Sequence, residues 1–174
     1  IAAMCMTSVM TFAQDIIRVS TDKTDLVMKV SPKGRLYQVY LGDKFLNPAD
    51  YNTLKWDVYA ASDGAVCQRG HEVYATSGAE DFFEPAVAVT HADGNMTTYL
   101  YYQSSEQKAV KGGTETVITL KDKVYPLTVK LHYVAYAKEN VIKAWSEISH
   151  KEKAPITLWR YRSTMLYLKS NTYF

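Results

Sequence analysis

A short acidic and aromatic segment, residues 80–84 with the sequence EDFFE, carries side chains that could act on a sugar. Glycoside hydrolases place two carboxylates on either side of the bond that they cleave. Successive residues of an extended strand point to opposite faces, so Glu80 and Asp81 would not both flank one bond in an extended segment. We interpret Asp81 as a hydroxyl-binding group beside a stacking ring, the alternative being a turn acid next to two core phenylalanines. No residue of the chain is assigned to catalysis.

Aromatic residues are the second candidate group. The chain holds 14 tyrosines, three tryptophans and five phenylalanines. Exposed rings can bind sugars by stacking, and Trp56, Tyr74 and Trp159 are candidates for such platforms. The alternative is that the rings pack the faces of β-sheets, where aromatic residues are enriched. Both interpretations favour a β-rich chain.

Other chemistries find no support in the sequence. None of the four histidines is close enough to another to form a ligand pair, and Cys67 has no C-x-x-C partner, so no metal site is predicted. The G-x-S-x-G motif and the glycine patterns that bind phosphate are absent, which argues against acyl transfer and nucleotide cofactors. The 20 basic and 18 acidic residues are interspersed, so no basic stripe for nucleic acid is present.

The elements that must position these residues are predicted to be strands. Apolar residues alternate with a period of two, most clearly over 127–136 (LTVKLHYVAY), where Leu127, Val129 and Leu131 would share one face. Further strands are predicted at 26–30, 36–41, 97–102, 117–120, 141–149 and 156–163. The segment 47–84 is the least regular part.

Turn residues separate these strands. The pairs Asp63-Gly64, Asp93-Gly94 and Gly112-Gly113 supply the positive φ that tight hairpins require, and Pro126 and Pro155 open strands. Strands at roughly ten-residue spacing with such turns predict an all-β, antiparallel sandwich.

The two ends of the sequence suggest export and truncation. Residues 1–14 (IAAMCMTSVMTFAQ) are apolar and small, like the back half of a signal peptide, with Thr11 and Ala13 at the small-residue positions before cleavage. The domain would then span 15–174 and lie in a bacterial periplasm or outside the cell, without a membrane anchor. Because the chain starts without Met and stops within a pattern, we expect a piece of a longer protein.

Several stretches resemble, in order, the N-terminal part of family 36 α-galactosidases. Residues 36–46 (LYQVYLGDKFL) resemble the family's opening strand. Residues 72–86 (EVYATSGAEDFFEPA) are similar to its EYP…G…DFR.PA signature, matched at Glu72, Tyr74, Gly78, Asp81, Phe82, Pro85 and Ala86. Weaker similarities follow at 93–94, 98–103, 116–122, 129–142 and 148–158.

This resemblance implies a β-supersandwich, similar to galactose mutarotase, that precedes a (β/α)8 barrel. The family's barrel carries the Asp nucleophile and the Asp acid/base of a retaining mechanism, so both would lie beyond Phe174. Phe83 stands where the family has arginine, which removes one bidentate hydroxyl clamp unless Arg69 replaces it. The candidate sugar contacts in this chain are Asp81, Phe83, Tyr74 and Trp56.

The expected protein is therefore an exported, retaining α-galactosidase, of which this chain is the N-terminal domain. Its substrates would be terminal α-galactosides, such as raffinose-type oligosaccharides or galactomannan side chains. The domain would support the barrel, shape the sugar site and take part in any homo-oligomer, and it would be inactive alone. The alternative is a non-catalytic carbohydrate-binding or structural sandwich.

Overall fold

The computed structural model describes residues 16–55, 71–78 and 84–168. Almost all regular structure in these ranges is β. The strands are β1 Ile16–Ser20, β2 Thr24–Val30, β3 Leu36–Asp43, β4 Val87–Thr90, β5 Leu100–Val110, β6 Gly113–Asp122, β7 Leu127–Tyr136, β8 Val141–His150 and β9 Thr157–Tyr161. One 3-10 helix, η1, covers Pro48–Thr53 and begins where the Asn47 side chain accepts a bond from the Ala49 N–H.

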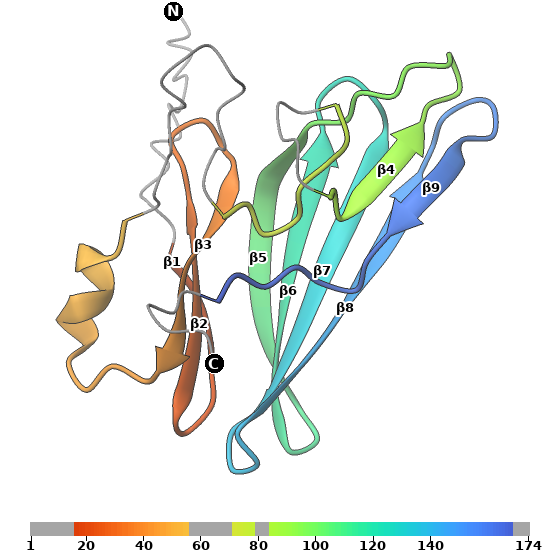
Figure 1. Cartoon of the computed structure of the whole chain (residues 1–174). Helices are drawn as coiled ribbons and strands as arrows, with labels where there is room; N and C mark the ends of the chain where they lie inside the picture. The colour runs from red at the N-terminus through yellow and green to blue at the C-terminus, as the bar shows by residue number, and fades with distance from the viewer. Residues whose placement is uncertain (1–15, 56–70, 79–83, 169–174) are drawn as a thin grey trace, which may run out of the picture.

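The strands form antiparallel sheets in two layers. One sheet has the order β1-β2-β3 and the other the order β5-β6-β7-β8. Figure 1 shows these sheets facing each other, with η1 on the outer side of the first. A short pair, β4-β9, lies beside the four-stranded sheet. The predicted antiparallel β-sandwich is therefore confirmed.

The core lies between the two layers. Leu127, Val129, Leu131 and Tyr133 of β7 are at most 2% exposed, as their alternation predicts. Opposite them, Ile17 and Val19 of β1 belong to the same apolar cluster, together with residues of β2. Each buried aliphatic or aromatic side chain contributes about 1.5–3 kcal/mol relative to an exposed one, so this cluster is the main source of stability.

The predicted strand 97–102 differs from the observed β5 at both ends. Thr98 and Tyr99 precede β5 instead of belonging to it, because the Thr98 N–H donates to the Ser77 carbonyl and the Tyr99 N–H to the Asp122 carboxylate. In the other direction β5 continues to Val110, because its polar residues pair with β6 throughout. The strands β1 and β4 were not predicted.

The predicted turns are confirmed where the structure describes them. Gly112 (φ +79°) closes the β5–β6 hairpin and Gly94 (φ +88°) closes the turn after β4. Asn140, at φ +53°, closes the β7–β8 hairpin and was not predicted. Asp63-Gly64 and the signal peptide predicted at 1–14 lie outside the described residues. In the described ranges, no helix has the length and apolar character that crossing a membrane requires.

Candidate functional site

The signature segment around Tyr74 packs into the sandwich. Tyr74 is 1% exposed, and its hydroxyl donates to the Arg162 carbonyl at 2.7 Å and contacts Ser146 Oγ at 3.1 Å. Burial raises the pKa of the Tyr74 hydroxyl. The prediction of Tyr74 as a sugar-stacking platform is wrong, because a ring enclosed by the core presents no face to a ligand. Its function is to join the signature segment to the residues that follow β9.

A largely buried ion pair positions the start of this segment. Arg35 Nε and Nη2 lie 2.6 and 2.7 Å from the two carboxylate oxygens of Glu72. Burial opposes the charge of Arg35, but the Glu72 carboxylate outweighs it and raises the pKa of the guanidinium. Glu72, which matches the family signature, thus has a structural role. Its bond to Arg35 connects residues 71–78 to the turn between β2 and β3.

The described residues on either side of 79–83 are both anchored. A Cβ at Gly78, which has φ +77°, would approach Thr97 Cα to 2.8 Å, so only glycine fits there. On the other side, the Glu84 carboxylate binds Arg160 at 2.9 Å and also Arg162. The predicted sugar contacts Asp81, Phe83 and Trp56, and the substitute Arg69, lie outside the described residues.

Trp159 on β9 is the exposed aromatic residue that the sequence analysis named. Its side chain is 67% exposed, and its indole N–H donates to Thr90 Oγ1 of β4 at 2.7 Å. This bond fixes the ring on the β4-β9 pair and leaves much of it open to solvent. Trp159 therefore has the geometry of a stacking platform, whereas Tyr74 does not.

The histidines serve the fold where the structure places them. His91 is buried; its Nδ1 lies 2.8 Å from Glu152 and its Nε2 2.9 Å from Thr98 Oγ1, and its ring stacks on Tyr125 at 3.5 Å. Burial opposes ionisation of Glu152, but the Ala92 N–H and the His91 ring outweigh it and hold the pKa of Glu152 below its usual range. This cluster connects the turn after β4 to the residues that follow β8.

A second cluster lies on the outer face of the four-stranded sheet. His132 stacks on Trp145 with ring centroids 4.7 Å apart, and its Nδ1 lies 2.8 Å from the Glu115 carboxylate. Lys108 binds the other oxygen of Glu115 at 2.9 Å. Hydrogen bonds from His132 and Lys108 lower the pKa of Glu115. Within the described part of the chain, no group of three or more potential ligands is arranged to hold a metal ion.

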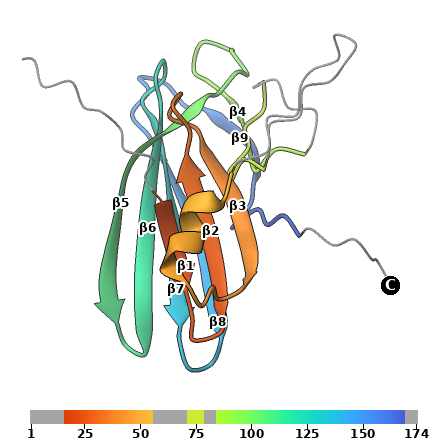
Figure 2. The same cartoon turned by 90° about the vertical axis from the view of Figure 1, so that its left-hand side faces the viewer.

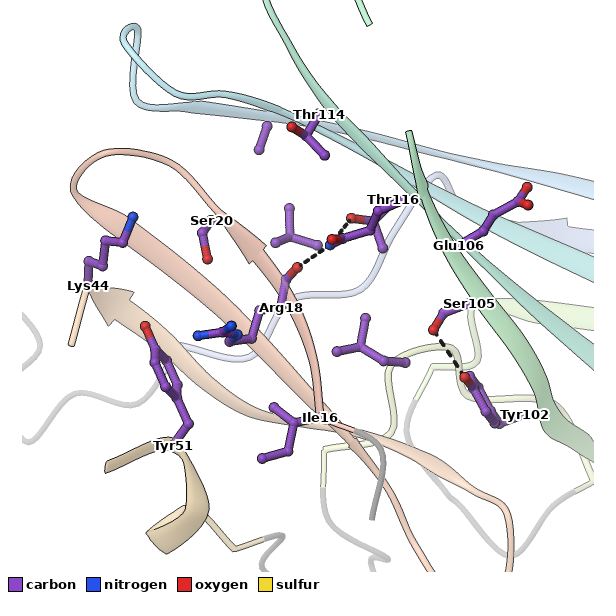
Figure 3. A pocket seen from close by; sticks show the side chains of 14 residues that line it. Ile16, Arg18, Ser20, Lys44, Tyr51, Tyr102, Ser105, Glu106, Thr114 and Thr116 are labelled. Carbon is purple, nitrogen blue, oxygen red and sulfur yellow. Dashed lines mark hydrogen bonds between the residues drawn. The ribbon is translucent and has the colours of Figure 1, made fainter. Parts of the chain in front are cut away.

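A cleft of about 790 Å³ lies between β1 and the strands β5 and β6. Side chains from both sheets line it (Figure 3), among them Arg18 and Ser20 of β1, Ser105 of β5 and Thr116 of β6. Most of the exposed lining is polar. Sequence reasoning missed this cleft because its walls come from strands about 90 residues apart, and β1 itself was not predicted.

Comparison with known proteins agrees with this architecture. The model of the glycosyl hydrolase family 36 N-terminal domain matches residues 34–174. Comparison with curated proteins gives no match.

Solved structures of similar fold include the α-galactosidase from Lactobacillus brevis, with a TM-score of 0.74 and 19% identity over 88% of this chain. The GH36 α-galactosidase AgaA from Geobacillus stearothermophilus follows with a TM-score of 0.72 and 22% identity over 86% of this chain. The galactosidase domain of the α-galactosidase-sucrose kinase AgaSK has a TM-score of 0.73 and 21% sequence identity over 86% of this chain. This chain covers 24% of each of these three proteins. With the family model matching most of its length, the chain belongs to the glycosyl hydrolase family 36 N-terminal domain family.

Proposed function

We propose that this chain is the N-terminal domain of an exported, retaining α-galactosidase that hydrolyses terminal α-galactosides. The observation that carries this proposal is the family match over residues 34–174. The similar α-galactosidases are about four times longer than the matched part, so the catalytic carboxylates belong to a downstream barrel. The domain supports that barrel and shapes one side of its sugar site.

Raffinose-type oligosaccharides and galactomannan side chains are the proposed substrates. Support comes from AgaA, whose solved forms include complexes with raffinose and with stachyose. Asp81 and Phe83 are proposed to contact the sugar, together with Trp56. Support for Asp81 and Phe83 comes from the resemblance of residues 72–86 to the family signature.

The proposed location is the periplasm or the exterior of a bacterial cell, reached through the signal peptide at 1–14. The proposed partners are the α-galactoside, the downstream barrel and further copies in a homo-oligomer. N-terminal sequencing of the secreted protein tests the export proposal. A mature protein that retains residues 1–13 would contradict it.

The enzymatic proposal is tested by sequencing the encoding DNA past Phe174 and assaying the full-length protein with p-nitrophenyl α-galactoside. We expect hydrolysis by the full-length protein and none by residues 15–174 alone. Asp81→Asn in the full-length protein should raise KM about 10- to 100-fold, the effect of losing one charge-assisted hydrogen bond. Asp22→Asn, at the exposed turn between β1 and β2, is the matched control and should leave KM unchanged.

A carbohydrate-binding module without catalysis is the second candidate, favoured by the exposed and oriented ring of Trp159. Titration of the protein with galacto-oligosaccharides, followed by tryptophan fluorescence, tests it. Binding that Trp159→Ala abolishes, in a gene product without a barrel, would support this function over the enzymatic one.

A further inference from the structure

The edge of β1 that faces the cleft carries main-chain groups available for pairing. The Arg18 carbonyl accepts a hydrogen bond from the Gln107 side-chain amide of β5 at 2.8 Å. Arg18 therefore directs its main-chain groups into the cleft and not toward β2. Because these groups alternate along a strand, Ile16 and Ser20 direct theirs into the cleft too, whereas Ile17 and Val19 pair with Met28 and Leu26 of β2.

The four-stranded sheet extends past this edge. Figure 2 shows β5 and β6 lying to one side of β1, with no described strand of the other sheet in front of them. Consistent with this view, every residue from Gln103 to Ala109 is exposed, although successive residues point to opposite faces. A strand exposed on both faces is unusual inside a sandwich, where each sheet covers the other.

The Gln107 side chain partly substitutes for a neighbouring strand. Its amide donates to the Arg18 carbonyl and lies 3.0 Å from Thr116 Oγ1, so it bridges the two sheets across the cleft (Figure 3). The bond to Arg18 is the kind that a backbone N–H of an added strand would make. A side chain can cover one carbonyl of an edge in this way, but not the whole edge.

A sugar fits the cleft less well than a strand does. Sugar sites present open aromatic faces, but the aromatic rings that line this cleft, Tyr51 and Tyr102, are 4% and 9% exposed. The Arg18 guanidinium also lies over the Tyr51 ring at 4.7 Å. What the cleft offers is a row of main-chain donors and acceptors with flanking hydroxyls, which matches an extended peptide.

We infer that the cleft receives an extended segment of the same polypeptide from beyond residue 174, which pairs with β1 and covers the inner faces of β6 and β5. This inference rests on the proposed function, because only a longer parent protein supplies such a segment. The similar α-galactosidases, of which this chain covers 24%, have the required length. A backbone N–H of the incoming strand donates to the Arg18 carbonyl in place of the Gln107 amide. The three-stranded sheet thereby gains a strand and covers more of the four-stranded sheet.

Hydrogen exchange in the full-length protein tests this pairing at single residues. The Ser20 amide should exchange as slowly as the Val19 amide, within about tenfold, because both would lie inside a sheet. Fast exchange at Ser20 and Arg18, with slow exchange at Ile17 and Val19, would overturn the inference. Protection that disappears on dilution would assign the cleft to a second copy of the protein and would overturn it too.

Proline substitution gives an independent readout. Ser20→Pro in the full-length protein removes an N–H that faces the cleft, and we expect a loss of several degrees in Tm. Ser20→Ala, which keeps the N–H, is the matched control and should change Tm little. Equal Tm values for the two variants would show a free edge and contradict the inference. A reading frame that ends near Phe174 would instead remove the proposed function, so the two failures are distinguishable.

Discussion

The strands β7 and β5 belong to one sheet but lie in different surroundings. On the inner face of β7, Val129 and Leu131 are at most 1% exposed and pack against the three-stranded sheet. On the inner face of β5, Ser105 and Gln107 are exposed and line the cleft. The residue types agree with these surroundings, since the covered strand is apolar on its inner face and the open strand is polar. From Gln103 to Ala109, β5 is thus maintained mainly by hydrogen-bond pairing, whereas Leu100 and Tyr102 at its start, like β7, are also stabilised by packing.

The largest expected difference between the two strands is in their response to truncation. Leu131→Ala should lower the free energy of unfolding by about 2–5 kcal/mol, because it leaves a cavity in the core. Urea denaturation of the purified protein measures this change. Ser105→Ala on β5 is the matched control, with an expected change within about 0.5 kcal/mol. Similar losses at both sites would show that β5 is covered as well.

Tyr133 lies on the buried face of β7, so its ionisation gives a second test of how well this strand is covered. Burial raises the pKa of this hydroxyl to about 12, above the value of about 10 in an unfolded chain. The unfolded state therefore loses the proton first, and stability should fall as the pH rises above about 10. The Tyr133→Phe variant should lose this part of the alkaline destabilisation, which urea denaturation between pH 8 and pH 11 measures. An unchanged pH dependence in the variant would assign the effect to other groups.

On the outer face of the sheet, Glu115 of β6 links β5 to β7, and we expect the stability of the fold to depend on this carboxylate at acid pH. His132 of β7 and Lys108 of β5 both lower the pKa of Glu115. A carboxylate with a lowered pKa stabilises the fold above its unfolded value of about 4.3, and this contribution is lost as the pH falls through the folded value. Glu115→Gln should therefore flatten the decrease in stability below about pH 5. Thermal unfolding from pH 7 to pH 3 measures it, with the exposed Glu139→Gln as control.

The smallest expected effect concerns the bridge across the cleft. Gln107→Ala removes the bonds to the Arg18 carbonyl and Thr116, and should cost about 1 kcal/mol or less because water reaches both groups. Chemical denaturation of the purified chain is precise enough to detect a change of this size in the midpoint. A loss above about 2 kcal/mol would mean that the bridge organises β1 and that β5 depends on more than its pairing with β6.

Local patterns predicted much of the fold. The alternation over 127–136 gave β7 with its observed bounds, and Gly112 marked the β5–β6 hairpin, because period and turn chemistry are local properties. The strand β4, with Val87 and Val89 fully buried, shows the same alternation but is only four residues long. The strand β1 follows directly after the segment assigned to the signal peptide, which hid its Ile17-Val19 alternation.

The candidate site was less predictable, because its geometry depends on distant contacts. Tyr74 is bonded to Ser146 and Arg162, which are 72 and 88 positions further along the chain. Nothing in the residues next to Tyr74 indicates whether its ring is enclosed or open. The same holds for Glu72, whose match to the family signature says that it matters but not that it pairs with Arg35.

The bonds that Tyr74 and Ser146 make to the Arg162 carbonyl also bear on synthesis at the ribosome. The strand β4 has its partner in β9, so neither the pair nor the Tyr74 contact can form until residues near 162 have emerged. At about 5–20 residues per second, the roughly 75 residues from Val87 to Arg162 take on the order of several seconds to synthesise. During that interval the apolar side of β4 has no partner strand. Until β9 appears, the apolar residues of β4 are thus an unpaired segment that favours aggregation of the nascent chain.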